Sequence, residues 1–259
     1  MGVIGPRRVG YELGIVESPD HRVPASGVSI SESTLSSEYM PEPVAWAVAT
    51  PPSPTGVVLC LHGRNGDHSA AFDKMFLHDV VADLQLPLAI VGVDGGPSSY
   101  WHRRADGRDP MTMVIDELLP AIDDAIGTSL PYAVLGWSMG GYGALLLGAT
   151  HPELFRTVAA ASPALWEHAH DASDGAFDSN EDFEANDVFV MRDALAASTV
   201  RVDCGTDDGF LGAAQSFAAG LPNPNLGGFS DGFHDDAYWR SIAPAQLTTI
   251  AAAIQSASR

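Results

Sequence analysis

The sequence predicts an α/β fold, in which helices cover both faces of a mostly parallel central sheet. Short apolar, strand-like segments alternate with segments of helical spacing along the 259 residues, as in parallel strands joined by crossover helices. Hydrophobic residues make up 46% of the chain, which is ample for a large core. No stretch has the composition of an interdomain linker. We therefore expect one domain at 44–259, preceded by an irregular or edge-strand segment of the same domain at 1–43.

The first half of the domain is expected to begin with two strands, at 44–50 and 56–63. Both are apolar, and the turn-forming stretch PPSPT joins them. Residues 70–85 have helical spacing, which stops before Pro87 because proline cannot continue a helix. The apolar segment LAIVGVD at 88–94 then predicts a buried strand.

The remaining elements follow from the same two patterns. Strands are expected at 132–136, 156–162 and 199–205, and helices at 113–126, 142–149 and 244–257. The long segment at 163–197 is acidic, carries aromatic residues and lies between two predicted strands. Long connections of this kind are often functional, so we expect a lid-like insertion over the carboxyl edge of the sheet.

The charge balance limits the possible partners. The chain has 33 acidic and 13 basic residues, a net charge of −20, and Lys74 is its only lysine. This argues against nucleic acids and anionic membrane surfaces, and it favours neutral over strongly anionic substrates. No apolar run approaches the roughly 20 residues that span a bilayer. The N-terminal residues lack the apolar core of a signal peptide, so we expect a cytoplasmic protein, with secretion as the alternative.

The stretch GWSMGGYGAL, 136–145, surrounds one serine with glycines. It joins an apolar strand to a helical pattern, and this context is typical of the nucleophile elbow, G-x-S-x-G, with Ser138 as the nucleophile. Such a serine has a strained backbone, and Gly136 and Gly140 remove side chains that would collide with it. The alternative is an ordinary glycine-rich turn with a capping serine.

A nucleophilic serine needs a histidine as base and an acid to orient that histidine. With this elbow, the acid and then the histidine follow the serine along the chain. Of the nine histidines, only His234 follows the last predicted strand. The acid is expected in the loop GTDDGF, which contains Asp207 and Asp208. One of the two is then the catalytic acid, and the other belongs to the turn.

An oxyanion intermediate needs two backbone donors. The amide of Met139, directly after the nucleophile, is one candidate, and the other is expected in an earlier loop. The stretch LCLHGRNGD fits, because Gly63 lets the backbone turn and the amide of Arg64 can then face the site.

Two further groups of residues have alternative interpretations. His62, Asp67 and His68 could be metal ligands, but their spacing fits no specific metal signature and the oxyanion loop accounts for them. We therefore expect no metal or organic cofactor. Cys60 and Cys204 each lie in an apolar, strand-like segment, which is typical of buried thiols rather than of a disulfide framework.

Aromatic residues near the predicted site are candidates for binding substrate. Tyr100 and Trp101 follow the strand at 88–94, and Trp166 and Phe177 lie in the insertion. Each could line an acyl or alcohol pocket. Ordinary packing at the rim or in the core is an equally good interpretation of all four.

The motifs HGRNGDH, GWSMGGYGAL, CGTDDGF and GFHDDAYW occur in this order. With them the chain resembles the α/β-hydrolase superfamily. Within it, the chain is similar to the esterase group that contains esterase D (S-formylglutathione hydrolase) and the antigen 85 mycolyltransferases. The resemblance spans roughly 44–257, and its most specific part is the elbow with the G-Y-G-A-L that follows it.

The resemblance implies site residues and an activity. It implies a triad of Ser138, Asp208 and His234, the acid being the second aspartate of D-D-x-F, and an oxyanion hole formed by the amides of Arg64 and Met139. It also makes a disulfide between the two cysteines implausible. The implied function is a serine carboxylesterase that hydrolyses neutral esters through an acyl-enzyme. The alternatives are an acyltransferase of antigen 85 type and a non-catalytic binding protein on the same fold.

Overall fold

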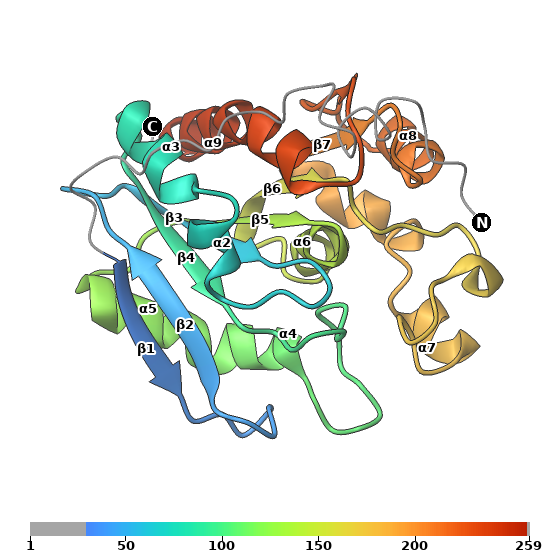
Figure 1. The fold of residues 1–259 in the computed structure, drawn as a ribbon, viewed down its shortest axis with the longest axis horizontal. Coiled ribbons are helices and arrows are strands. Elements are labelled where there is room, and N and C mark those ends of the chain that lie inside the picture. The colour runs from blue at the N-terminus through green and yellow to red at the C-terminus, as the bar shows by residue number, and fades with distance from the viewer. Residues whose placement is uncertain (1–29, 258–259) are drawn as a thin grey trace, which may run out of the picture.

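The computed structural model describes residues 30–257, and its strands form one eight-stranded sheet (Figure 1). The strands are β1 (Ile30–Leu35), β2 (Val44–Ala49), β3 (Gly56–Leu61), β4 (Leu88–Val93), β5 (Tyr132–Trp137), β6 (Phe155–Ala161), β7 (Thr199–Gly205) and β8 (Phe229–Ser230). Their order in the sheet is β1-β2-β4-β3-β5-β6-β7-β8. The β1–β2 and β2–β4 pairs are antiparallel, and the pairs from β4 to β8 are parallel.

Helices cover both faces of the sheet. They are α2 (Ala70–Asp73), α3 (Leu77–Asp83), α4 (Pro110–Met113), the π-helix η1 (Val114–Leu118), α5 (Leu119–Ile126), α6 (Met139–Thr150), the 3₁₀-helix η2 (Ala169–Asp171), α7 (Asn180–Ala185), the 3₁₀-helix η3 (Val190–Ala197), α8 (Leu211–Ala219) and α9 (Asp236–Ala257). Helices α2, α3 and α9 pack on one face, and α5 and α6 pack on the other. Figure 1 shows α3 and α9 on the opposite side of the sheet from α4 and α5.

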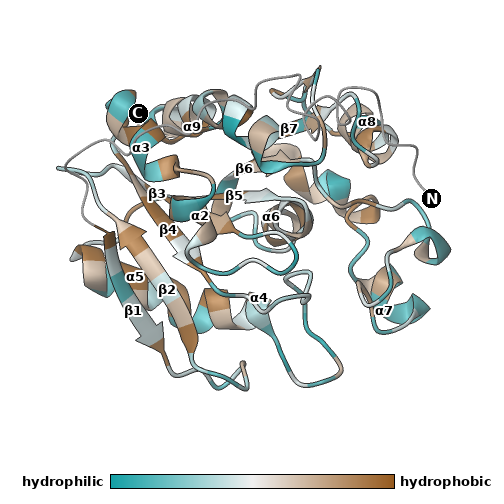
Figure 2. Ribbon diagram, in the orientation of Figure 1, coloured by the Kyte–Doolittle hydropathy of each residue, from teal (hydrophilic) through white to brown (hydrophobic). Residues whose placement is uncertain are grey.

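The central strands connect the two hydrophobic cores. Every residue of β3 is buried. Val57, Leu59 and Leu61 pack with α5 and α6, whereas Val58 and Cys60 pack with α2, α3 and α9. A parallel strand covered on both faces needs apolar side chains in both directions, which explains the uninterrupted apolar sequence of β3. In Figure 2 the hydrophobic colours lie along the central strands, while β1 and α7 carry hydrophilic stretches.

The predicted fold class is confirmed, but several boundaries differ from the predictions. The helix expected at 70–85 is two helices, because Phe76 has a left-handed backbone (φ 50°) that an α-helix cannot contain. The closing helix begins at Asp236 rather than at residue 244, with Pro244 inside it. Pro244 cannot donate a backbone hydrogen bond to the preceding turn of the helix. The buried face of α9, which includes Leu247, Ile250 and Ile254, stabilises the helix despite this loss.

Strand β8 and helix α8 were not anticipated from the sequence, and β1 lies where the sequence left an irregular segment and an edge strand as alternatives. The residues of β1 are exposed and polar at most positions, so they carry no apolar pattern, and β8 has only two residues. Strand β1 lies in the predicted N-terminal segment, of which residues 1–29 are outside the described part. Among the helices of residues 30–257, none is both long and apolar enough to cross a bilayer.

Candidate active site

The serine of the elbow lies between β5 and α6 with a strained backbone. Ser138 has φ 55° and ψ −120°, a combination that side chains other than glycine rarely adopt. Hydrogen bonds hold this conformation, because the Ser138 amide donates to the Ala161 carbonyl and the Ser138 carbonyl accepts from Ala164, both at 3.0 Å. A Cβ atom on Gly140 would overlap the Leu61 carbonyl oxygen, and one on Gly136 would overlap the Gly140 carbonyl. Glycine is therefore required at both positions.

Three side chains from separate loops meet at this turn. His234, in the loop between β8 and α9, places Nε2 2.8 Å from the Ser138 hydroxyl oxygen. Its Nδ1 lies 2.9 Å from Oδ2 of Asp208, in the loop after β7. The carboxylate of Asp208 accepts a hydrogen bond from the Nδ1–H group of His234. The neutral ring therefore carries no proton on Nε2, which faces the serine hydroxyl. The serine proton thus has an acceptor in place.

The structure places Asp208, rather than Asp207, against the imidazole. Asp208 is buried, and its Oδ1 also accepts from the Phe210 amide at 2.9 Å. Burial by itself raises the pKa of Asp208, but the hydrogen bond and the charge of His234, together with the Phe210 amide, hold that pKa below its usual value. Asp207 is exposed, and its amide donates to the Gly232 carbonyl. This bond fixes the turn that aims the neighbouring carboxylate at His234.

The two expected oxyanion donors lie on either side of the serine. Met139 is the first residue of α6, where an amide has no acceptor inside the helix. Arg64 lines the same cavity as Ser138, and Gly63 packs against Ser138, so the loop after β3 lies beside the elbow. Within residues 30–257, neither the Arg64 nor the Met139 amide donates to another protein group. Both amides are available to a ligand.

His62 has a structural place in that loop. The buried ring donates from Nδ1 to the Gly63 carbonyl (2.8 Å), and its Nε2 accepts from the Gly95 amide (3.1 Å). Both ring nitrogens are therefore occupied by backbone groups. The Asp67 carboxylate accepts from Ser69 instead of turning toward His62. No three metal-ligating side chains converge anywhere in the described part of the chain.

A cavity of about 360 Å³ opens beside Ser138 and His234. Trp137 and Trp239 form its aromatic walls, and its charged side chains are Arg64, Lys74 and Asp236. The indole ring of Trp239 meets the His234 ring edge-on, with 5.1 Å between centroids. Sequence reasoning missed Trp239, Lys74 and Asp236, because nothing local shows that α2 and α9 border the same cavity.

A second set of aromatic rings connects His234 with the insertion. The Phe210 ring lies 5.2 Å from the His234 ring, and Trp166 meets Phe210 edge-on at 5.5 Å. Tyr100 packs on Trp166 at 5.7 Å and is itself buried. Two of the aromatic residues predicted to bind substrate are thus connected to the site through Phe210, which the sequence did not single out.

Trp101 corrects one expectation. Its side chain is completely buried, and its ring packs on Gly95 and Gly143, where a Cβ atom would overlap the indole. The indole nitrogen donates to the His62 carbonyl at 3.3 Å. Trp101 is therefore a core residue that supports the loop after β3, and it does not line a substrate pocket.

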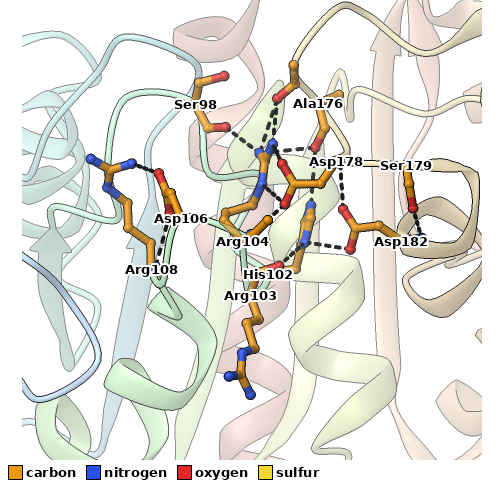
Figure 3. Close-up of polar contacts among 12 residues, drawn as sticks. Ser98, His102, Arg103, Arg104, Asp106, Arg108, Ala176, Asp178, Ser179 and Asp182 are labelled. Atoms are coloured by element: carbon orange, nitrogen blue, oxygen red, sulfur yellow. Dashed lines mark hydrogen bonds and ion pairs between the residues drawn. The ribbon is translucent and has the colours of Figure 1, made fainter.

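The segment at 163–197 is attached to the loop after β4 by an ion pair (Figure 3). Arg104 binds Asp178 with Nη2 2.8 Å from Oδ1, and it also donates to the Ser98 carbonyl at 2.8 Å. The Ala105 amide donates to the same carboxylate at 2.7 Å. The hydrogen bond from Arg104, with that amide, lowers the pKa of Asp178 to about 2. This contact holds the insertion, with Trp166, beside the site.

Comparison with protein-family models matches residues 37–242 to the family described as "Putative esterase". The match covers most of the chain. The chain belongs to this esterase family. The resemblance inferred from the sequence motifs is thereby confirmed. Small-molecule esters are the substrates of such enzymes, and no curated protein matches the esterase with significant similarity.

Solved structures similar to the esterase include three enzymes or relatives of this group. A ferulic acid esterase has 24% identity and a TM-score of 0.74, covering 86% of this chain and 97% of its own. An S-formylglutathione hydrolase from Agrobacterium tumefaciens has 19% identity and a TM-score of 0.73, covering 89% and 97%. MPT51 from Mycobacterium tuberculosis has 17% identity and a TM-score of 0.69, covering 88% and 100%. These likenesses confirm the α/β-hydrolase fold.

Proposed function

We propose that the esterase is a serine carboxylesterase with Ser138 as nucleophile, His234 as general base and acid, and Asp208 as the group that orients His234. The observation that supports this is the continuous chain of hydrogen bonds from Asp208 Oδ2 to His234 Nδ1 (2.9 Å) and from His234 Nε2 to the Ser138 hydroxyl (2.8 Å). A serine hydroxyl is a weak nucleophile unless an adjacent base accepts its proton, and this geometry supplies that base.

The acylation step uses these groups in order. Ser138 Oγ forms a bond to the ester carbonyl carbon while its proton passes to Nε2 of His234. The carbonyl oxygen becomes negatively charged and accepts from the amides of Arg64 and Met139, which have no other acceptor among residues 30–257. The carbon–oxygen bond to the alcohol then breaks, and His234 gives the leaving oxygen its proton. Asp208 stabilises the imidazolium while it exists.

Deacylation repeats the same exchange with water. His234 accepts a proton from a water molecule as that water attacks the acyl-enzyme carbonyl, and it returns the proton to Ser138 Oγ when the acid leaves. We also propose that the segment at 163–197 acts as a lid, with Trp166 and Phe210 bordering the acyl group. The net charge of −20 favours neutral over polyanionic esters by long-range repulsion.

A fluorophosphonate probe with a Ser138→Ala variant tests the proposal. The wild-type protein should be labelled covalently and should hydrolyse 4-nitrophenyl acetate. The alanine variant should do neither, while its thermal unfolding stays close to that of the wild type, because one oxygen is removed. Labelling of the variant, or hydrolysis at the wild-type rate, would place the nucleophile elsewhere.

A further inference from the structure

The catalytic cavity contains positive charge that ester hydrolysis itself does not need. Arg64, from the loop after β3, and Lys74, at the end of α2, line it together with Ser138 and His234. Lys74 is the only lysine in a chain that has 33 acidic residues. In so acidic a protein, two cations at the nucleophile need an explanation.

Neither cation is neutralised by an ion pair within the described residues. Three arginines elsewhere are paired, in Arg104–Asp178, Arg108–Asp106 and Arg201–Asp203. The side chains of Arg64 and Lys74 are exposed and form no such pair. They are therefore available to a ligand.

Among the side chains that line the cavity, the two cations outnumber the carboxylates. Asp236 is the one carboxylate that lines the cavity among residues 30–257. Arg240 adds a further cation close by, since its Nη1 donates to the Lys74 carbonyl at 3.2 Å. The charge of Arg64 also reaches Tyr100, where it opposes the rise in pKa that burial causes.

We propose that the cavity binds an ester that carries a free carboxylate, held by Lys74 and the Arg64 side chain while Ser138 attacks the ester carbonyl. This inference rests on the proposed function. The net charge of −20 is spread over the whole surface and is screened beyond about 10 Å at 0.1 M salt. The two cations lie at the cavity itself, within that distance of a bound ester, so they determine how tightly a single carboxylate binds there.

Two pairs of matched esters test the proposal and show which side of the ester carries the charge. Methyl pentanoate and monomethyl glutarate differ by a carboxylate on the acyl side, and propyl acetate and 3-acetoxypropanoate differ by one on the alcohol side. Hydrolysis of each ester breaks its acyl–oxygen bond, adds one water and releases one alcohol and one acid. Proton release in a pH-stat therefore measures all four on the same scale.

Substitutions at two positions distinguish the effect of charge inside the cavity from the effect of the overall net charge. Lys74→Gln removes one positive charge from the cavity. Arg156→Gln removes one from β6, where the side chain is exposed and away from the cavity. The two variants have the same net charge, so long-range repulsion changes equally in both. Lys74→Arg restores the charge and serves as the rescue.

We expect wild-type kcat/KM for one carboxylate ester to exceed that of its neutral partner by at least about fivefold at low salt, and this preference should fall as salt rises. Lys74→Gln should lose most of the preference through a higher KM for the carboxylate ester. Arg156→Gln and Lys74→Arg should keep it. The inference is overturned if neither pair shows a preference, if neither carboxylate ester is hydrolysed, or if Lys74→Gln and Arg156→Gln behave alike. Failure to hydrolyse 4-nitrophenyl acetate as well would instead overturn the proposed function.

Discussion

Replacing Asp208 by asparagine changes the tautomer of His234 while keeping the shape of the site. The carboxylate accepts from two donors, the Phe210 amide at Oδ1 and His234 Nδ1 at Oδ2. Asparagine has one oxygen and one NH₂ group. Because a buried backbone amide needs an acceptor, we expect the oxygen to face Phe210 and the NH₂ group to face Nδ1. The ring proton then moves to Nε2, which can no longer accept the proton of Ser138.

The expected loss is large because the base is removed, not just weakened. In serine proteases this substitution lowers kcat by about 10⁴, which corresponds to roughly 5.5 kcal/mol of transition-state stabilisation. Stability should also change with pH. The folded-state pKa of Asp208 is depressed, so its ionised form stabilises the fold above the unfolded pKa of about 3.9, and this stabilisation is lost as pH falls through the folded value. The melting temperatures of wild type and variant should converge in acid.

The matched control is Asp207→Asn, which removes the same charge one residue away. Its side chain is exposed, and the hydrogen bond to Gly232 comes from the backbone. We expect a loss of less than about tenfold in kcat for this variant, measured with 4-nitrophenyl acetate at pH 7. A large loss in Asp207→Asn with a mild one in Asp208→Asn would refute the reasoning. Mild losses in both would mean that His234 is oriented by another group.

Three further predictions concern other parts of the molecule. Gly140→Ala should prevent folding or sharply lower the melting temperature, because its methyl group would overlap the Leu61 carbonyl; wild-type unfolding in a thermal scan would contradict this. Incubation with EDTA should leave the esterase rate unchanged, since both ring nitrogens of His62 bind backbone groups; inactivation reversed by zinc would reassign that loop. Cys60 and Cys204 should resist iodoacetamide at pH 8 in the folded protein and react in denaturant, as mass spectrometry would show. Burial raises the pKa of both thiols, that of Cys204 to about 12.

The sequence alone determined the fold class, and it singled out the proposed nucleophile and its proposed base. The signals for these are short-range or depend on order along the chain. A Cβ atom on Gly136 would overlap the Gly140 carbonyl within one strand–turn–helix unit, so the pattern around Ser138 is visible in a short stretch of sequence, although Gly140 also packs on Leu61 of β3. His234 is singled out because it is the one histidine that follows the last strand of the parallel sheet. Apolar runs such as that of β3 predict strands covered on both faces without any knowledge of their neighbours.

Tertiary structure decided what depends on the direction of single side chains and on segments far apart in the chain. Residues alone left Asp207 and Asp208 open, because the choice depends on a backbone bond from the first to Gly232, in another loop. Residues alone left Trp101 open between a substrate pocket and ordinary packing, because the glycines that its ring packs on, Gly95 after β4 and Gly143 in α6, are distant in the chain. Lys74 carried no signal in sequence, because its place beside the nucleophile exists only when α2, α9 and the elbow pack around one cavity.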